Sequence, residues 1–215
     1  MSNVDWIRLL QQQRAIAVIR AQDWELGRQM ALAVASGGMR LIEITWNSDK
    51  PQALIAQLRS QLPECTIGTG TLLNLEQMQQ ALAAGAQFLF TPHVDPTLIG
   101  MALDADIPIV PGALSPTEIV TAWQAGATCV KVFPIQAVGG ANYIRSLQGP
   151  LGQIPLIPTG GVTLENAGEF LRAGAIAVGL AGDLFPQKLI VNRNWEAIAN
   201  RAANFMQQLT TISTC

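Results

Sequence analysis

The sequence predicts an α/β protein, a single-domain (β/α)8 TIM barrel that occupies residues 1–215. Short apolar runs suited to buried strands alternate with amphipathic segments suited to helices along the whole chain. A helix end rich in small residues leads into an apolar run four times, and no linker-like segment interrupts the pattern. Glycine suits the left-handed residue that ends a helix. The glycines expected in this role are roughly 40–50 residues apart: Gly37, Gly85, Gly126 and Gly174.

Eight apolar runs are the expected strands of this barrel. Their nearly continuous apolar character suits parallel strands that are covered on both faces. Four of them form the second half of the repeated segments, which span residues 35–45, 83–92, 124–134 and 172–182. The other four lie outside these repeats, at residues 15–20, 66–71, 107–112 and 154–161.

The segments between the strands are amphipathic and are expected to form helices on the outside of the barrel. The strongest start signal is Ser115 followed by Pro116, an N-cap residue before a proline at the first helical position. Asn74, and Thr163 with Asn166 nearby, are weaker start signals. The expected helices include residues 23–36, 50–62, 74–84, 115–125, 163–173 and 194–209.

A doubly wound parallel sheet is the competing architecture, because it also alternates strands with helices. Its usual glycine-rich turn, GxGxxG directly after the first strand, is missing from this chain. Eight strands with about as many helices in some 200 residues therefore favour the compact barrel.

Composition and charge narrow the classes of function. The net charge is −2 and no cluster of lysine and arginine occurs, so nucleic-acid binding is not expected. No apolar stretch approaches the roughly 18 residues that a transmembrane helix needs, so membrane insertion is not expected either. The N-terminal segment lacks the charged, apolar and small-residue regions of a signal peptide.

Cysteine and histidine usage predicts a cytoplasmic protein without a metal centre. Cys65, Cys129 and Cys215 are odd in number and widely spaced, which suits a reducing compartment. No metal-ligand spacing occurs, and the single histidine, His93, is expected to be an ordinary loop residue.

Strand alternation places a lysine and a glutamate inside the predicted barrel. In CVKVF, Val130 and Val132 are expected to face the helices, which leaves Lys131 inside. In RLIEIT the same alternation leaves Glu43 inside. Functional side chains gather at the C-terminal ends of barrel strands, so the two charges are expected in one barrel mouth.

Two interpretations fit this pair. The first is a structural ion pair, which seldom adds net stability because both charges lose their hydration. The second is a Schiff-base lysine, because burial favours the neutral amine that attacks a carbonyl carbon. Glu43 is then the candidate general acid and base, and no metal is needed. Lys50, at a helix start, and Lys188, in a late loop, suit the nucleophile role poorly.

Glycine-rich segments follow the last two strands, in PTGGV (158–162) and GLAGD (179–183). The backbone N–H groups of such turns can hold a phosphate, and barrels often bind phosphate at these two loops. Tight turns alone are the other interpretation. In combination with Lys131, the pattern favours a phosphorylated ligand.

Six motifs resemble those of the 2-keto-3-deoxy-6-phosphogluconate (KDPG) aldolases and their 6-phosphogalactonate relatives: EITWNS, GTGTLLN, FTPHVDP, PGALSPTE, VKVFPIQAVGG and PTGGVTLEN. The resemblance extends from about residue 14 to residue 186. It implies a metal-independent class I aldolase that cleaves a phosphorylated 2-keto-3-deoxy sugar acid into pyruvate and glyceraldehyde 3-phosphate. It also implies a (β/α)8 barrel without a cofactor, usually a homotrimer.

The same resemblance assigns roles to residues of this chain. It implies that Lys131 forms the Schiff base and that Glu43 shuttles protons. It implies that Thr71 and Pro92 line the pyruvate side and that Phe133 packs beside the lysine. The sugar-acid and phosphate end is implied to consist of Thr159, Gly160, Gly161, Ala181 and Gly182.

Two positions depart from the family pattern. The gluconate enzymes commonly have an arginine four residues beyond the glutamate, where this chain has Asn47, as in the galactonate type. A neutral amide makes no bidentate charged contact with a carboxylate, so Arg20 at the end of the first strand is the expected replacement. Gly182 stands where relatives often have a phosphate-binding serine, so a hydroxyl contact is lost.

The resemblance leaves the substrate open. Asn47 and Asp183 favour the galactonate epimer, whereas Thr159 favours the gluconate epimer. A third candidate substrate is 4-hydroxy-2-oxoglutarate. Two alternatives to an aldolase are another phosphate-binding barrel enzyme, such as an isomerase in which Lys131 acts only electrostatically, and a non-catalytic sugar-phosphate-binding protein.

Overall fold

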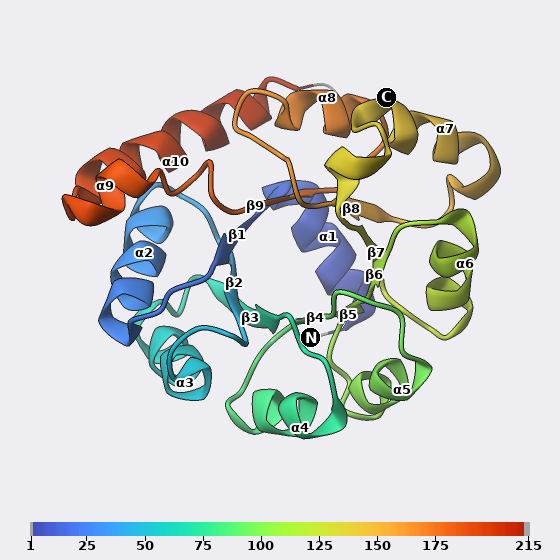
Figure 1. Cartoon of the computed structure of the whole chain (residues 1–215), viewed down its shortest axis with the longest axis horizontal. Coiled ribbons are helices and arrows are strands. Elements are labelled where there is room, and N and C mark those ends of the chain that lie inside the picture. Colours follow the sequence, from blue (N-terminus) through green and yellow to red (C-terminus); the bar gives the residue numbers. More distant parts are fainter. Residues whose placement is uncertain (1, 213–215) are drawn as a thin grey trace.

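The computed structural model describes residues 2–212, so Cys215 lies outside the described residues. Strands curl around a central axis, and helices cover them from the outside (Figure 1). Every pair of neighbouring strands runs parallel. The chain is therefore a parallel α/β protein, as its alternating sequence pattern predicts.

Nine strands form two sheets in the described part of the chain. The larger sheet has the order β5-β4-β3-β2-β1-β9, and the smaller one has the order β6-β7-β8. The strands are β1 (Ala15–Ile19), β2 (Leu41–Thr45), β3 (Thr66–Gly70), β4 (Leu89–Phe90), β5 (Ile109–Val110), β6 (Gly112–Ala113), β7 (Val130–Val132), β8 (Leu156–Pro158) and β9 (Val178–Leu180).

The two sheets approach each other at two points. Only Pro111 separates β5 from β6, and proline has no N–H to donate to a neighbouring strand. The strand predicted at 107–112 is therefore two short strands in different sheets. At the other junction Thr159, directly after β8, forms an isolated parallel bridge with Gly179 of β9.

Apart from α1, the helices occupy the outer layer in the same order as the strands (Figure 1). A short 3-10 helix, η1 (Ile135–Val138), follows β7. The α-helices are α1 (Asn3–Gln13), α2 (Trp24–Ser36), α3 (Pro51–Gln61), α4 (Leu75–Ala83), α5 (Pro96–Asp104), α6 (Pro116–Gln124), α7 (Ala141–Leu151), α8 (Ala167–Arg172), α9 (Gln187–Val191) and α10 (Trp195–Thr210).

Two helix starts predicted from the sequence are confirmed. Oγ of Ser115 accepts the N–H of Glu118, and the Glu118 carboxylate accepts the N–H of Ser115, so a capping box begins α6. Oδ1 of Asn74 accepts the N–H of Gln77 and caps α4.

The helix predicted from residue 163 begins later, at Ala167. Thr163 and Asn166 explain the delay, because each donates its N–H to the side chain of the other. These reciprocal bonds stabilise a turn in front of α8, so the side chains that suggest a helix start hold a loop instead.

Most repeat glycines have the expected left-handed backbone. Gly85, Gly126 and Gly174 have φ values of 83°, 97° and 103°. Gly37 does not fit the prediction, since its φ is −77° and the left-handed residue is Gly38 with φ 91°. The end of α2 is thus shifted by one residue within the Gly-Gly pair.

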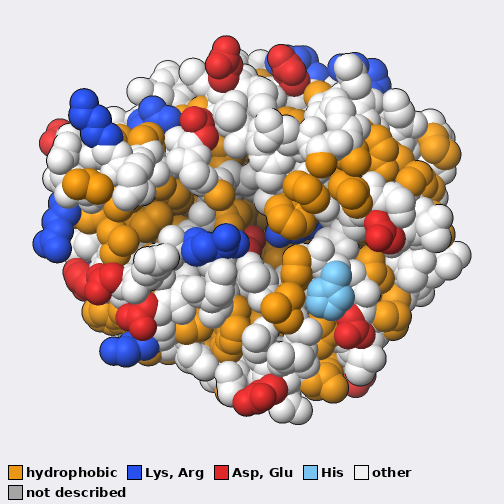
Figure 2. All heavy atoms as spheres, in the orientation of Figure 1, with side chains coloured by type: hydrophobic (Ala, Val, Ile, Leu, Met, Phe, Trp, Pro, Cys, Tyr) orange, Lys and Arg blue, Asp and Glu red, His pale blue; other side chains and the backbone are white. Residues whose placement is uncertain are grey.

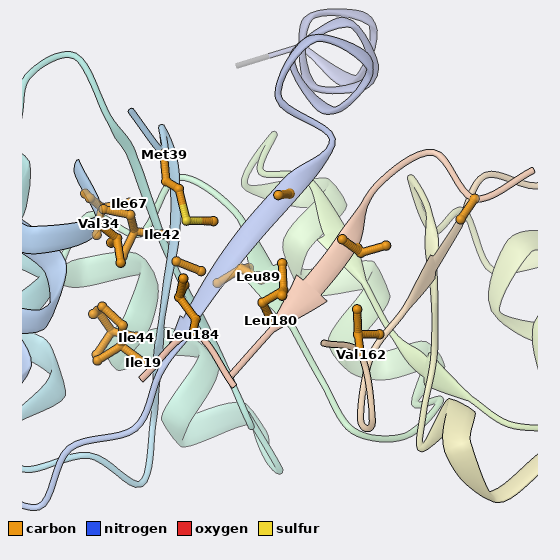
Figure 3. Close-up of a cluster of buried hydrophobic side chains, with 14 of the residues drawn as sticks. Ile19, Val34, Met39, Ile42, Ile44, Ile67, Leu89, Val162, Leu180 and Leu184 are labelled. Atoms are coloured by element: carbon orange, nitrogen blue, oxygen red, sulfur yellow. The ribbon is translucent and has the colours of Figure 1, made fainter. Parts of the chain in front are cut away.

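Buried side chains form two layers, an inner layer within the ring of strands and an outer layer between strands and helices. Trp6 of α1 stacks on Phe88 with ring centroids 4.8 Å apart, and α1 lies across the centre of the ring (Figure 1). Figure 3 shows part of the outer layer, where Ile42 of β2 lies beside Val34 of α2. The inner layer consists of Trp6, Leu10, Ile16, Leu41, Phe88, Phe90, Val110, Cys129, Ile157 and Ala177.

None of the helices between residues 2 and 212 combines the length and the apolar character needed to cross a membrane.

Candidate active site

Lys131 lies in the middle of β7 with its side chain turned into the ring of strands. Its neighbours Val130 and Val132 pack in the outer layer, and Cys129 packs in the inner layer. Only 6% of Lys131 is exposed. The alternation predicted from the sequence is confirmed for this strand, and it places the lysine inside.

Aromatic rings lie close to the Lys131 amine. Nζ is 4.5 Å from the centroid of the Phe133 ring and 5.9 Å from that of Phe90. Burial lowers the pKa of Lys131 below that of an ordinary lysine; the Glu43 carboxylate opposes this shift, and the Arg20 guanidinium adds to it. The neutral, nucleophilic amine is therefore more populated than it is for a lysine in water.

Glu43 lies on β2 within the same ring and is 1% exposed. Burial raises the pKa of its carboxyl, while Lys131 and Arg20 oppose that shift. Its Oε1 has no hydrogen-bond partner among the residues that the structure describes. A buried carboxyl with a raised pKa and a free oxygen can exchange protons with a bound molecule.

Gly70, the last residue of β3, makes room for this carboxyl. A Cβ atom at position 70 would overlap Oε1 of Glu43 and would also press on Phe90. The pattern TIGTGT predicts only a strand here. The need for glycine comes from a contact between strands, which no local pattern reports.

We expect Gly70→Ala to destabilise the protein by about 1–3 kcal/mol, because the added methyl group overlaps a buried side chain. Gly100→Ala, within α5, is the matched control, since a Cβ there has no atom within 4 Å. Alanine in a helix is expected to increase stability slightly. Thermal unfolding of both variants measures the difference, and equal unfolding temperatures would contradict the predicted overlap.

Arg20 and Asn47 follow two neighbouring strands that pair in parallel, β1 and β2, and both side chains are exposed. Val18 of β1 pairs in register with Glu43 of β2, so Arg20 follows two residues beyond that pair, and its charge contributes to the pKa shifts of both Lys131 and Glu43. On the face shown in Figure 2, basic side chains and a small, mostly covered acidic patch are visible close together near the centre of the molecule. The structure thus brings together the cation predicted to replace the missing arginine and the Lys131–Glu43 pair.

Thr71 and Pro92 follow β3 and β4 and are half-buried. Thr71 has φ 63°, a left-handed conformation that is rare and strained for a β-branched residue. The backbone of Pro92 lies against Gly112, where a Cβ atom would meet it. Strain of this kind accumulates at functional sites, which marks Thr71 as a candidate functional residue.

Gly160 and Gly161 both have left-handed backbone, with φ values of 83° and 92°. A Cβ at Gly160 would lie 3.1 Å from the Phe133 ring, and one at Gly161 would lie 2.5 Å from Gln136. Glycine therefore lets this loop approach the residues that follow β7. Gln136, an exposed residue of η1, is a neighbour of the site that the sequence motifs do not single out.

Thr159 lies in the wall of the ring rather than in the open loop. It is 7% exposed, and its Oγ1 would be 2.6 Å from a Cβ atom at Gly179 of β9. The packing of this threonine on a glycine brings the end of β8 close to β9.

Ala181 and Gly182 are exposed in the turn after β9. Oδ2 of Asp183 accepts the N–H of Leu164 at 2.9 Å, which ties this turn to the loop after β8. A Cβ built at Gly182 has no atom within 4 Å, so this position faces open space. The two glycine-rich loops therefore lie side by side.

Within residues 2–212 there is no group of three or more His, Cys, Asp or Glu side chains that could hold a metal ion. The charged groups of the site are Arg20 directly after β1, Glu43 within β2 and Lys131 within β7. A neutral amine can attack a carbonyl carbon, a carboxyl can move protons, and a guanidinium can bind a carboxylate.

Comparisons with known proteins agree with this chemistry. A family model described as KDPG and KHG aldolase matches residues 7–201. A 2-dehydro-3-deoxy-phosphogluconate aldolase from Haemophilus influenzae is 34% identical over 193 residues, which are 89% of this chain and 91% of that protein.

Two solved structures are also similar. A KDPG aldolase from Legionella pneumophila, with pyruvate captured as a covalent carbinolamine, has a TM-score of 0.85 at 27% identity. That match covers 93% of this chain and 97% of the Legionella chain. A cube-shaped protein cage designed by fusing symmetric oligomeric domains has a TM-score of 0.80 at 29% identity, and covers 92% of this chain and 74% of the cage chain.

Proposed function

The chain belongs to the KDPG and KHG aldolase family, and from this premise we propose that it is a class I aldolase that cleaves KDPG into pyruvate and glyceraldehyde 3-phosphate. The main support for the proposal is the buried Lys131 amine, which lies near the buried Glu43 carboxyl and whose pKa is lowered by burial. The carbinolamine in the Legionella relative supports it, since such a species forms when an amine adds to a carbonyl carbon.

In the proposed reaction the neutral Nζ of Lys131 adds to C2 of the keto acid, and loss of water gives an iminium ion. Glu43 takes the proton of the C4 hydroxyl while the bond between C3 and C4 breaks. The electron pair of that bond moves toward the iminium nitrogen and leaves an enamine, and glyceraldehyde 3-phosphate departs. Glu43 then returns the proton to C3, and water hydrolyses the iminium to release pyruvate.

The other predicted residues bind the substrate in this proposal. Arg20 binds the carboxylate beside the Lys131–Glu43 pair. Asn47 is neutral, so any contact it makes with the substrate is uncharged. Thr71, Pro92 and Phe133 enclose the pyruvate part. The sugar-acid and phosphate end contacts the two glycine-rich loops, through Thr159, Gly160, Gly161, Ala181 and Gly182.

A closed (β/α)8 barrel and a homotrimer are part of the proposal. If β5 and β6 are the two halves of one strand interrupted at Pro111, the nine strands correspond to eight barrel strands. The bridge between Thr159 and Gly179 then joins β8 to β9. The symmetric oligomeric domains of the designed cage support an oligomer. We also place the protein in the cytoplasm, a reducing compartment that suits the free thiols of Cys65 and Cys129.

A coupled assay for pyruvate release tests the function. It is run in parallel on KDPG, on its 6-phosphogalactonate epimer and on 4-hydroxy-2-oxoglutarate. We expect release from KDPG that persists in EDTA, because no step in the proposed reaction uses a metal. Turnover of only the epimer or only 4-hydroxy-2-oxoglutarate would reassign the substrate. Ligand-dependent stabilisation without any pyruvate release would point to a non-catalytic binding protein.

Gly182→Ser is expected to lower the KM for the phosphorylated substrate by roughly tenfold, because one hydrogen bond to a charged group contributes about 1.5–3 kcal/mol. The position has room for the side chain, since no atom lies within 4 Å of a Cβ there. The KM for unphosphorylated 4-hydroxy-2-oxoglutarate is expected to stay the same. An equal change for both substrates would mean that this loop does not bind the phosphate.

A further inference from the structure

The loop after β2 holds the backbone next to Arg20. The N–H of Ala21 donates to Oγ of Ser48 at 3.2 Å, and the N–H of Asp49 donates to the carbonyl oxygen of Ala21 at 2.9 Å. The N–H of Trp24, the first residue of α2, donates to Oδ2 of Asp49 at 3.1 Å. Both backbone polar groups of the residue after Arg20 are therefore bonded to one neighbouring loop.

Ser48 also contacts the strand of Glu43. Its Oγ lies 3.2 Å from Oγ1 of Thr45, and its N–H donates to the carbonyl oxygen of Thr45 at 2.9 Å. Thr45 is two residues after Glu43 and therefore on the same face of β2. Ser48 is 8% exposed and Thr45 is 1% exposed, so little water competes for these bonds. One buried hydroxyl thus connects the loop of Arg20 with the strand of the proposed acid and base.

The Ser48 connection is important because the site has few positively charged side chains that could bind the carboxylate of a substrate. Asn47 is neutral and exposed, so it supplies no charged contact. The side chain of Arg20 is long and exposed, and ordering such a side chain on binding costs about 0.5–1.5 kcal/mol. A fixed backbone reduces the number of positions that the guanidinium samples before it binds the substrate.

We propose that Ser48 is a positioning residue that holds Arg20 beside the Lys131–Glu43 pair, so that the guanidinium binds the carboxylate of the keto acid. The proposal rests on the aldolase function, in which Lys131 forms a Schiff base with that keto acid. Ser48 acts through the backbone of Ala21 and does not touch the substrate.

Ser48→Ala tests the role through pyruvate, which has the carboxylate and the keto group but no phosphate. Borohydride traps the Schiff base, and mass spectrometry measures the adduct on Lys131 as pyruvate is varied. We expect Ser48→Ala to raise the half-saturating pyruvate concentration, and the KM of the full substrate, by roughly three- to tenfold, the factor for one lost hydrogen bond. The kcat is expected to stay within about twofold. Ser48→Thr keeps the hydroxyl and should restore both values.

Two further variants separate positioning from general loss of stability. Ser115→Ala removes a hydroxyl that accepts a backbone N–H at 3.3 Å in another strand–helix loop, and it should lower the unfolding temperature without changing KM. Asp49→Ala removes a different bond of the loop that holds Arg20, the one between the Asp49 carboxylate and the N–H of Trp24. It should raise KM as Ser48→Ala does. A KM that rises equally in Ser115→Ala would overturn the specific role of Ser48.

A double-variant cycle gives the decisive comparison. In an Arg20→Ala background, Ser48→Ala should have no further effect on the pyruvate dependence, because its effect passes through Arg20. Full additivity would overturn the inference. An adduct that forms on Lys131 in Ser48→Ala with unchanged pyruvate dependence also overturns it, and leaves the aldolase function intact. The absence of any adduct in the unaltered protein would contradict the aldolase function itself.

Discussion

Lys131→Ala is expected to lower kcat by roughly 10⁵-fold or more, the scale on which enzymes lose activity when a covalent nucleophile is removed. The expectation follows from position, because Lys131 is 6% exposed inside the ring, whereas Lys50 and Lys188 are exposed. Without the amine no iminium forms, and the bond between C3 and C4 has no electron acceptor. Pyruvate release measures the loss, and borohydride reduction in the presence of pyruvate should add no mass to the variant.

Lys50→Ala is the matched control, since it removes a lysine of the same chain that lies on the surface. It should retain both turnover and the trapped adduct. Trapping in the unaltered protein should also increase with pH, and the increase should occur at a lower pH than the one at which an ordinary lysine loses its proton. Burial lowers the pKa of Lys131, and the neutral amine is the nucleophile. Residual turnover in Lys131→Ala, or an adduct on Lys50, would overturn the Schiff-base assignment.

The inward position of Lys131 could be predicted because it depends on a local rule. Successive side chains of a strand point to opposite faces, so the apolar Val130 and Val132 fix the direction of the lysine between them. The same rule correctly places Glu43 inside. Neither prediction needs knowledge of which strands are neighbours.

Features that depend on contacts between strands could not be predicted in this way. Gly70 must be glycine because the Glu43 carboxyl lies against it, and Ser48 matters because Ala21 of the preceding loop bonds to it. These partners are 27 residues apart in each case, from position 43 to 70 and from 21 to 48. No periodic pattern within one strand encodes such a contact.

Local signals also fail where a sequence offers two choices. Either glycine of the pair Gly37-Gly38 can adopt the left-handed conformation, and Gly38 adopts it. Gly37 must be glycine for another reason, because a Cβ there would overlap the backbone of Ala199 in α10. Thr163 and Asn166 can cap a helix or close a turn, and they close a turn through reciprocal bonds.

Glu43→Gln is expected to lower kcat by about 10²–10⁴-fold, the usual contribution of a general acid or base. The amide has almost the same shape, so it should occupy the space that Gly70 leaves, but it does not transfer a proton at the required rate. Lys131 remains present, so borohydride should still trap pyruvate after longer incubation. The variant therefore separates proton transfer from Schiff-base formation.

Exchange of the pyruvate methyl protons in heavy water measures that proton transfer directly. Pyruvate bound to Lys131 forms the enamine of the proposed reaction only when a proton leaves C3, so the unaltered protein should incorporate deuterium. Glu43→Gln should incorporate it 10²–10⁴-fold more slowly, which is about the factor by which kcat is expected to fall. Glu165→Gln, an exposed carboxyl outside the ring, should exchange at the normal rate. Normal exchange in Glu43→Gln would assign proton transfer to another group. Because Oε1 of Glu43 is buried without a partner in the described residues and lies near the Lys131 amine, we expect the loss of exchange instead.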